Sequence, residues 1–240
     1  MGSLDTYQHR SRVQPAFLCF LPATITLAAT FGFARGAVTG LLTIAGATGL
    51  TYLIAIFVRD RGRHIEPALW DSWGGKPTTQ LLRAPVDDNP GALRRRWKVM
   101  SQLQPELRRH DDVDAPSDEA IDDYVGYLRE VTRNNDDYRL VATENAGYGF
   151  RRNMLGLRPL GMLLSGAAAI WAVTTLGMAL ANSHRSHALL AAVELVLDLG
   201  SWYFWVRVIS PSWVKEQAFN YARALLGAAE KLSSTQSSTP

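Results

Sequence analysis

The sequence predicts an all-α membrane protein with two transmembrane helical hairpins, four spans in all, and an all-helical cytoplasmic domain between them. Three observations lead to this fold class. Apolar residues are concentrated in long runs without charges. Basic residues flank the same end of these runs. No segment outside the runs alternates polar and apolar residues with the period of two that half-buried strands show. The net charge of +3 and the mean hydropathy of -0.05 hide this division, because they average apolar spans with a strongly charged domain.

Three runs contain no Asp, Glu, Lys, Arg or His: Ala16–Ala34 with 19 residues, Gly36–Val58 with 23 and Pro159–Ser183 with 25. At about 1.5 Å per residue, each is long enough to cross a hydrocarbon core of about 30 Å. The fourth predicted span, Ala188–Val206, also has 19 residues but carries two acids. It is included because an arrangement with only three spans would leave a long apolar segment without an assigned location.

The basic residues decide the orientation of the spans, because cytoplasmic loops carry an excess of Lys and Arg. The short connections inside the two hairpins hold only Arg35 and Arg185, whereas the other side of the spans holds Arg10, Arg12, Arg59, Arg61, Arg63, Arg151, Arg152, Arg158, Arg207 and Lys215. We therefore expect both termini and the middle region in the cytoplasm. The aromatic residues near the cytoplasmic end of the fourth span fit a belt at the lipid interface: Trp202, Tyr203, Trp205 and Trp213.

The predicted organisation has six segments. They are a cytoplasmic N-terminal segment (1–15), a first transmembrane hairpin (16–58), a cytoplasmic helical domain (59–157), a second hairpin (158–209), a cytoplasmic amphipathic helix (210–232) and a disordered tail (233–240). The amphipathic helix begins at Ser210 and Pro211. We expect its apolar stripe to pack on the domain, on a sister subunit or on the membrane.

Caps and helical periodicity outline the cytoplasmic domain. Pro67 opens a short helix, Ala68–Trp73, which ends at Gly74 and Gly75. Thr78 or Thr79 caps the next helix, Gln80–Arg83. Further helices are expected from Asn89 and Pro90 to about Leu103, after the N-cap Ser117 with Ile121, Tyr124, Val125 and Leu128 on one face, and from about Leu140 to Leu157 into the third span.

Glu194 and Asp198 are the most informative residues of the spans. Their spacing of four residues places both on one helix face near the middle of the bilayer. A charge at that depth costs about 2.5–3.5 kcal/mol on insertion scales, and no Lys or Arg lies at matching depth in the other spans. Either the acids are protonated and hydrogen-bonded to hydroxyls such as those of Thr43, Thr174 or Thr175, or they face water. In a symmetric oligomer, the second arrangement makes Glu194, Asp198 and Ser201 the lining of a cation pathway.

Three segments carry the candidate ligand-binding residues Lys76, Arg94, Arg95, Arg96, Trp97, Arg151 and Arg152. In Gly74–Thr79, glycines and a lysine ahead of a helix suit a phosphate, but a connection between two helices explains them equally well. In Arg94–Lys98, cations around an indole suit a nucleic acid, anionic lipid head groups or a plain solvated face. In Tyr148–Asn153, the arginine pair also fits an anchor at the start of the third span.

The sequence holds no pattern of an enzyme. The domain has two histidines, His64 and His110, and no cysteine, and the metalloprotease, α/β-hydrolase and dinucleotide-binding motifs are absent. The acidic stretch Asp111–Asp123 lacks the order and the glycine of a calcium-binding loop. We therefore expect no catalytic residue, no metal site and no cofactor. The single cysteine, Cys19, excludes an intrachain disulfide.

Two strings resemble a widespread family of small bacterial membrane proteins. His64–Arg83 follows the pattern E-P-x-L-W-x-x-W-G-G-x-P-T-T-x-L-L-R, and Glu144–Asn153 contains Y-G-F-R-R-N, with paired spans after it. Members often continue with R-H, whereas Ala84 follows Arg83 here. Residues 15–210 fit this layout, which is also similar to the channel effectors of the Hailong-type anti-phage system. That resemblance implies an oligomeric ion channel of the bacterial inner membrane, which is held shut by a nucleic-acid oligomer that a partner nucleotidyltransferase makes.

The sequence favours a homo-oligomeric, cation-permeable channel, with a tetramer as the preferred assembly. Its cytoplasmic domain would gate it by binding an anionic, nucleotide or nucleic-acid-like ligand, and it would act in anti-phage defence. Four helices of one chain enclose no aqueous pore of useful width, so conduction requires an oligomer. The alternative is a membrane-anchored adaptor or scaffold without conduction, in which Glu194 and Asp198 are buried, protonated and structural.

Overall fold

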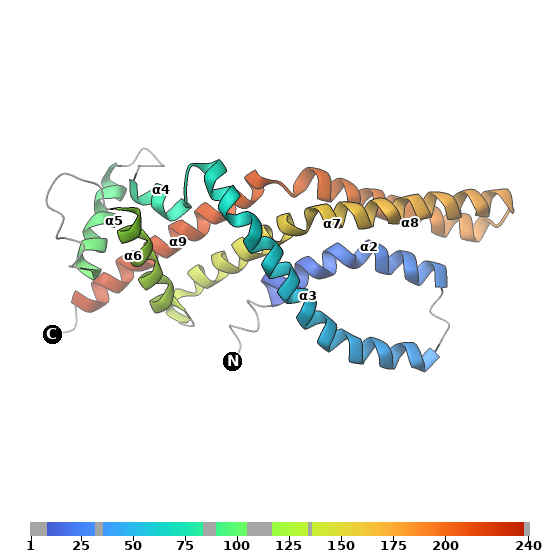
Figure 1. Ribbon diagram of the computed structural model, residues 1–240, viewed down its shortest axis with the longest axis horizontal. Coiled ribbons are helices and arrows are strands. Elements are labelled where there is room, and N and C mark those ends of the chain that lie inside the picture. Colours follow the sequence, from blue (N-terminus) through green and yellow to red (C-terminus); the bar gives the residue numbers. More distant parts are fainter. Residues whose placement is uncertain (1–8, 32–35, 84–89, 105–116, 134–135, 238–240) are drawn as a thin grey trace. The chain divides into compact units, whose positions relative to one another are not determined.

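The computed structural model describes residues 9–31, 36–83, 90–104, 117–133 and 136–237, and in these ranges it contains helices and turns but no strand (Figure 1). The predicted all-α class is confirmed. The elements are η1 (His9–Val13), α2 (Gln14–Phe31), α3 (Gly36–Trp73), α4 (Pro77–Arg83), α5 (Pro90–Leu103), α6 (Asp118–Thr132), η3 (Asp136–Tyr138), α7 (Arg139–Ala181), α8 (Arg185–Tyr203), η4 (Phe204–Val208) and α9 (Pro211–Ser237).

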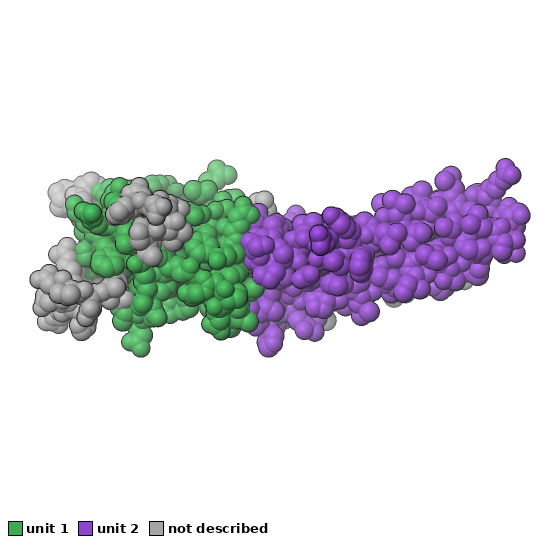
Figure 2. Space-filling view, turned by 90° about the horizontal axis from the view of Figure 1, so that it is seen from above, with its two compact units in different colours: residues 1–7, 66–148, 214–240 green, residues 8–65, 149–213 purple. Residues whose placement is uncertain are grey.

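The chain divides into two compact units, coloured separately in Figure 2. Unit 1 comprises residues 1–7, 66–148 and 214–240, and unit 2 comprises residues 8–65 and 149–213. The long helices α3 and α7 each contribute residues to both units. The predicted cytoplasmic domain, 59–157, therefore does not coincide with unit 1, since its first seven and last nine residues belong to unit 2.

Glycines explain why the outer parts of that segment belong to unit 2. A Cβ added to Gly156 of α7 would lie 2.8 Å from the backbone of Arg61 and Gly62 in α3. The two helices therefore cross with their backbones in contact, which only a glycine permits. Asn153 lies beside this crossing, and its buried amide donates to the Ser11 carbonyl of η1 at 2.7 Å.

The core of unit 1 joins α4, α5, α6, the start of α7 and α9. Ser117 caps α6 as predicted, because its hydroxyl accepts a hydrogen bond from the Ala120 N–H at 3.2 Å. The predicted apolar face of α6 is buried in this core: Ile121, Tyr124, Val125 and Leu128. Burial also raises the pKa of the Tyr124 hydroxyl, which keeps it neutral.

The amphipathic helix α9 packs on the domain, the first of the three alternatives that its sequence left open. Its contribution to the core of unit 1 is Phe219, Ala222, Leu225, Leu226, Ala228 and Ala229. The helix continues to Ser237, five residues beyond the predicted end at 232, so the predicted disordered tail is wrong for residues 233–237. Ser233 and Ser234 stay helical with their hydroxyls donating to carbonyls three residues earlier.

The connection between α3 and α4 differs from the prediction in two ways. Pro67 does not open a new helix, because α3 runs through it to Trp73. The buried side chains of Leu69 and Trp73 anchor this last part of α3 in unit 1, which offsets the hydrogen bond that proline removes. Thr78 does not cap α4 either. The helix starts at Pro77, whose ring fixes the backbone angle φ for a first helical position.

Two helices among the described residues are long and apolar enough to cross a membrane, and most of the first and all of the second belong to unit 2. One covers Asp136–Ala181 and includes α7, and the other covers Arg185–Val208 and includes α8. Large apolar side chains are exposed along both helices, among them Leu163, Ile170, Leu189, Leu190 and Val196, each at least 65% exposed. Such surfaces suit lipid rather than water. Of the four predicted spans, the third and the fourth thus correspond to helices that are long and apolar enough to cross a membrane.

The core of unit 2 lies where α2, α3, α7 and η4 meet. The buried side chains there are Ala16, Cys19, Val58, Met154, Leu157, Trp205 and Ile209. Trp205 is completely buried against Gly161, where an added Cβ would overlap the indole ring. Trp205 therefore lies in a protein core and not in the predicted lipid-facing belt. Trp202 and Tyr203 beside it are 41% and 60% exposed, as that belt requires.

Candidate functional site

The two carboxylates of α8 lie on the buried side of that helix. Glu194 is 7% exposed and Asp198 is 1% exposed. They continue a stripe of small buried residues, Ala188 and Ala191, at the spacing of one helix face. The opposite face carries the exposed side chains of Val193, Val196, Leu197 and Leu199. Both acids therefore point into unit 2 of a single chain.

Neither carboxylate is fully paired. Within the described part of the chain, Glu194 Oε1 and Asp198 Oδ2 are buried without a hydrogen-bond partner. The hydroxyls that were the predicted partners are used elsewhere, since Thr174 donates to Ile170 O and Thr175 donates to Ala172 O, both at 3.0 Å. The third predicted partner, Thr43, belongs to residues 27–54, whose side chains lie outside the described part.

An unpartnered buried carboxylate oxygen is costly, because burial removes its hydration and nothing replaces it. Two of them on one face, four residues apart, create a site that favours a proton or a cation. Ser201, the third predicted lining residue, is half-buried on the same helix. The burial of the acids inside one chain does not match a pore lined by the outer surface of α8. The burial fits the other arrangement that the sequence allowed, in which the acids are protonated and bonded to hydroxyls of other spans, but the described hydroxyls Thr174 and Thr175 do not make these bonds.

Arginines of α7 bind the region after α8 and the first turn of α9. Here the helix changes to the π-helix η4, and Arg158 donates from Nε to Trp205 O at 3.1 Å and from Nη2 to Val206 O at 2.9 Å. Arg151 donates to Trp213 O at 2.8 Å, and its guanidinium stacks over the Trp213 ring at 4.9 Å. The bonds of Arg158 satisfy carbonyls that the irregular helix η4 leaves free at its end. Sequence reasoning assigned Arg158 only to the charge bias and missed this contact, although a charged residue directly before a span was a signal.

The predicted phosphate loop at Gly74–Thr79 is the joint between α3 and α4. Gly74 and Gly75 have φ angles of +84° and +119°, and the Gly75 N–H bonds to Trp70 O at 2.8 Å, which closes the end of α3. The Gln80 amide donates to the carbonyls of Trp73 and Gly75 at 2.9 and 2.7 Å. Lys76 forms an ion pair with Asp122 of α6 and lies over the Trp70 ring. The connection between helices, and not the phosphate cradle, accounts for these residues.

Some residues of the basic segment of α5 make contacts within unit 1, and others are exposed to solvent. Trp97 Nε1 donates to Leu82 O at 2.6 Å and Arg96 donates to Leu81 O at 3.2 Å, so both residues close the C-terminal end of α4. Arg94 and Arg95 are exposed. Lys76 lies just before the first residue of α4 and Arg96 binds near its last, so these candidate residues stand at opposite ends of that helix and do not converge on one site.

The arginine pair of α7 belongs to unit 2. Arg151 binds Trp213 O, and the half-buried Arg152 donates to the side chain of Asn153 at 3.4 Å, with all four residues in unit 2. The neighbouring Tyr148 belongs to unit 1, where its hydroxyl donates to Glu66 Oε1 at 2.6 Å and its ring stacks on Tyr221. The string Tyr148–Asn153 is thus a set of structural contacts. Among the residues with described side chains, no three His, Cys, Asp or Glu gather as a metal site.

Comparison of the chain with protein-family models, with curated proteins and with solved structures gave no match. The arguments for its function therefore come from its own residues.

Proposed function

We propose that the chain is a four-span membrane protein and forms a homo-oligomeric, cation-permeable channel, for which a tetramer is the favoured assembly. The spans are α2, the apolar first part of α3, the apolar second part of α7, and α8. Two of them, α7 and α8, have the length and the hydropathy of spans, and their exposed apolar faces suit lipid. The charge bias puts both termini and unit 1 in the cytoplasm and fits a bacterial inner membrane.

The observation that carries the proposal is the unpartnered pair Glu194 and Asp198. Acids that served only the packing of helices would be hydrogen-bonded, because a buried carboxylate without a partner destabilises the fold. Among the described residues these two lack such partners at Oε1 and Oδ2. Cations that pass through the membrane domain would supply the missing ligand. The described conformation, with both acids turned inward, corresponds in this proposal to the non-conducting channel.

Gating would start in unit 1. Helices α3 and α7 are continuous between unit 1 and unit 2, so a change in unit 1 has a direct route to the membrane segment. An anionic ligand, such as a nucleotide or an oligonucleotide made by a partner nucleotidyltransferase, would act by binding two states of unit 1 with different affinity. Arg94 and Arg95 are the best remaining candidates to contact it, because Lys76, Arg96, Trp97, Arg151 and Arg152 already make the contacts described above. A role in anti-phage defence follows from the sequence resemblance alone.

A second candidate function is a non-conducting membrane adaptor. The burial of Glu194 and Asp198 inside unit 2 favours it, because a structural role places acids between helices of the same chain. In that case both acids are protonated and their missing partners come from helices α2 and α3.

Cation flux into liposomes separates the two functions. The purified wild type and the double variant Glu194→Gln/Asp198→Asn are reconstituted at equal density, with Asp60→Asn as a control that removes an exposed acid of α3. The channel predicts flux in the wild type and in the control, and a loss or an altered cation selectivity in the double variant. Unchanged conductance and selectivity in the double variant would refute the pore assignment, and an oligomer without flux would support the adaptor.

A further inference from the structure

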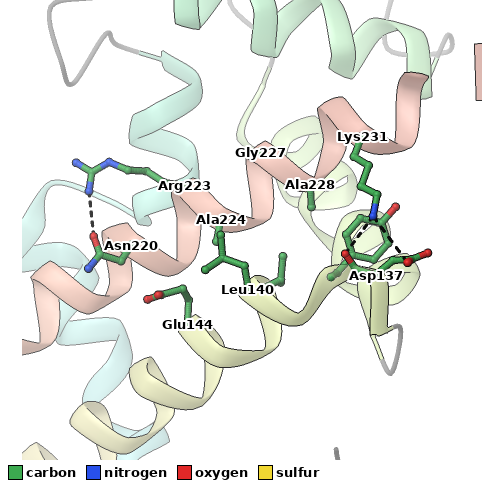
Figure 3. Close-up of a pocket in the computed structure, with 11 residues that line it drawn as sticks. Asp137, Leu140, Glu144, Asn220, Arg223, Ala224, Gly227, Ala228 and Lys231 are labelled. Atoms are coloured by element: carbon green, nitrogen blue, oxygen red, sulfur yellow. Dashed lines mark hydrogen bonds and ion pairs between the residues drawn. The ribbon is translucent and has the colours of Figure 1, made fainter. Parts of the chain in front are cut away.

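A groove of about 520 Å³ runs along unit 1 between the start of α7 and the middle of α9 (Figure 3). Asp137, Leu140 and Glu144 form one wall, and Arg223, Gly227 and Lys231 lie on the other. It belongs entirely to unit 1 and shares no residue with the proposed intramembrane site.

Leu140 is an exception on the surface of unit 1. It is 64% exposed, and no other large hydrophobic side chain in the described part of unit 1 is exposed. Lipid does not explain it, because Asp136, Asp137 and Arg139 directly precede it. It also lies 19 residues before Pro159, where the third predicted span starts, which is about 28 Å along a helix. An apolar side chain at such a place is typical of a protein contact.

The opposite wall of the groove has room for such a side chain. An added Cβ at Gly227 would have no neighbouring atom within 4 Å, and Ala224 and Ala228 lie beside it on α9. Small residues of this kind let another helix approach closely. The hollow is open to solvent, whereas a small-molecule site encloses most of its ligand.

The charges of the two walls are opposite. One wall carries the acids Asp137, from η3, and Glu144, from the start of α7, and the α9 wall carries the bases Arg223 and Lys231 (Figure 3). Lys231 donates to Asp137 O at 3.2 Å, and its ammonium lies 3.9 Å from Asp137 Oδ1, so it is held in the groove. Both side chains remain more than half exposed and accessible to a partner.

We propose that this groove is the contact between two copies of the chain. A two-fold axis parallel to the helices lays α7 of one copy over α9 of the other, so that Leu140 enters the partner's hollow at Gly227 and each acidic wall meets a basic wall. Such a contact is isologous, because the same surface serves both copies. It pairs two copies, so a tetramer of the proposed function would contain two such pairs, and it can be tested without ion flux.

Site-directed cross-linking in native membranes tests the contact directly. Cys19 is first replaced by serine. One copy then carries Leu140→Cys and a second copy, with another tag, carries Gly227→Cys. The control partner is Gly126→Cys, since Gly126 is an equally exposed glycine of unit 1 with open space around it, on α6. The expected result is a cross-linked pair of differently tagged copies with Gly227→Cys and a loss of that product with Gly126→Cys.

Charge exchange provides a second test, which alters the charged walls of the groove and uses the cross-link between Leu140→Cys and Gly227→Cys as its readout. Adding Lys231→Glu to the Gly227→Cys copy places two acidic walls together and is expected to reduce cross-linking about two- to fivefold. Adding Asp137→Lys to the Leu140→Cys copy is expected to restore it, because the opposite charges meet again. Restoration between separate chains requires a contact between them.

The outcomes separate this inference from the channel. An oligomer in detergent without the Leu140–Gly227 cross-link would overturn the contact and leave conduction standing. Equal cross-linking to Gly126→Cys, or a small molecule that protects Leu140→Cys in a monomer, would also overturn it. The specific cross-link in a protein without cation flux would support the contact and remove the channel.

Discussion

At the scale of single residues, the structure turns several predicted ligand-binding side chains into parts of the fold. Arg96 and Trp97 close the end of α4, and Arg151 binds the start of α9 at Trp213 O. For Arg96 and Trp97 the cause is the backbone carbonyls that the C-terminal end of a helix leaves free, which bind guanidinium and indole N–H groups. Residue types alone cannot distinguish this use from ligand binding, because the same donors serve both.

Gly161 provides a test of packing at one residue. Gly161→Ala is expected to destabilise unit 2 by about 1–3 kcal/mol, because the new methyl group overlaps the buried indole of Trp205. The matched control is Gly177→Ala in the same helix, which meets no atom within 4 Å and is expected to be neutral or slightly stabilising. Thermal unfolding in detergent measures both. Equal midpoints for the two variants would contradict the described contact between α7 and η4.

At the scale of elements, helix ends were predictable where local chemistry determines them. Ser117 starts α6 and the glycine pair stops α3, because a cap or a left-handed backbone acts within a few residues. The predicted helix start at Pro67 and the predicted end of α9 were wrong, because no local chemistry determines them. Packing of Leu69 and Trp73 carries α3 through a proline, and no local signal contains that information.

A substitution of Gly75 tests the turn between α3 and α4. Gly75→Ala is expected to destabilise unit 1 by about 1–2 kcal/mol, since its φ of +119° lies in a region that side chains with a Cβ avoid. Gly126→Ala in α6 is the control and is expected to stabilise by up to about 1 kcal/mol, because it sits in an open helical position. The test is chemical denaturation of both variants followed by circular dichroism. A Gly75→Ala protein as stable as the wild type would show that the turn tolerates another conformation.

At the scale of the whole molecule, the proposed function requires the chain to cross a membrane. The described residues contain two helices that are long and apolar enough to cross a membrane, and the proposal places the start of α7 and the end of α8 on the cytoplasmic side, where basic residues are concentrated. If α7 and α8 form such a hairpin, the turn between them must lie on the other side of the membrane.

Cysteine labelling tests this topology. In the Cys19→Ser background, Ser186→Cys at the start of α8 is expected to react with a membrane-impermeant maleimide added to intact cells whose outer membrane is permeabilised. Ser212→Cys in α9 is expected to react only after the inner membrane is opened. Both positions are exposed, so accessibility within the fold does not bias the result. Labelling of both from the same side would show that α8 does not cross the membrane.

The sequence by itself determined the helical class, the apolar segments of α7 and α8 and most helix starts and stops. These features depend on periodicity, hydropathy and capping, which act over one or two helical turns. The sequence also located Glu194 and Asp198 on one face of α8. Only the tertiary structure decided that this face is buried in unit 2, that α9 packs on unit 1, and that the arginines of α7 bind carbonyls near the end of α8. These outcomes depend on which distant segments meet, and a burial or a hydrogen bond across more than forty residues leaves no local pattern.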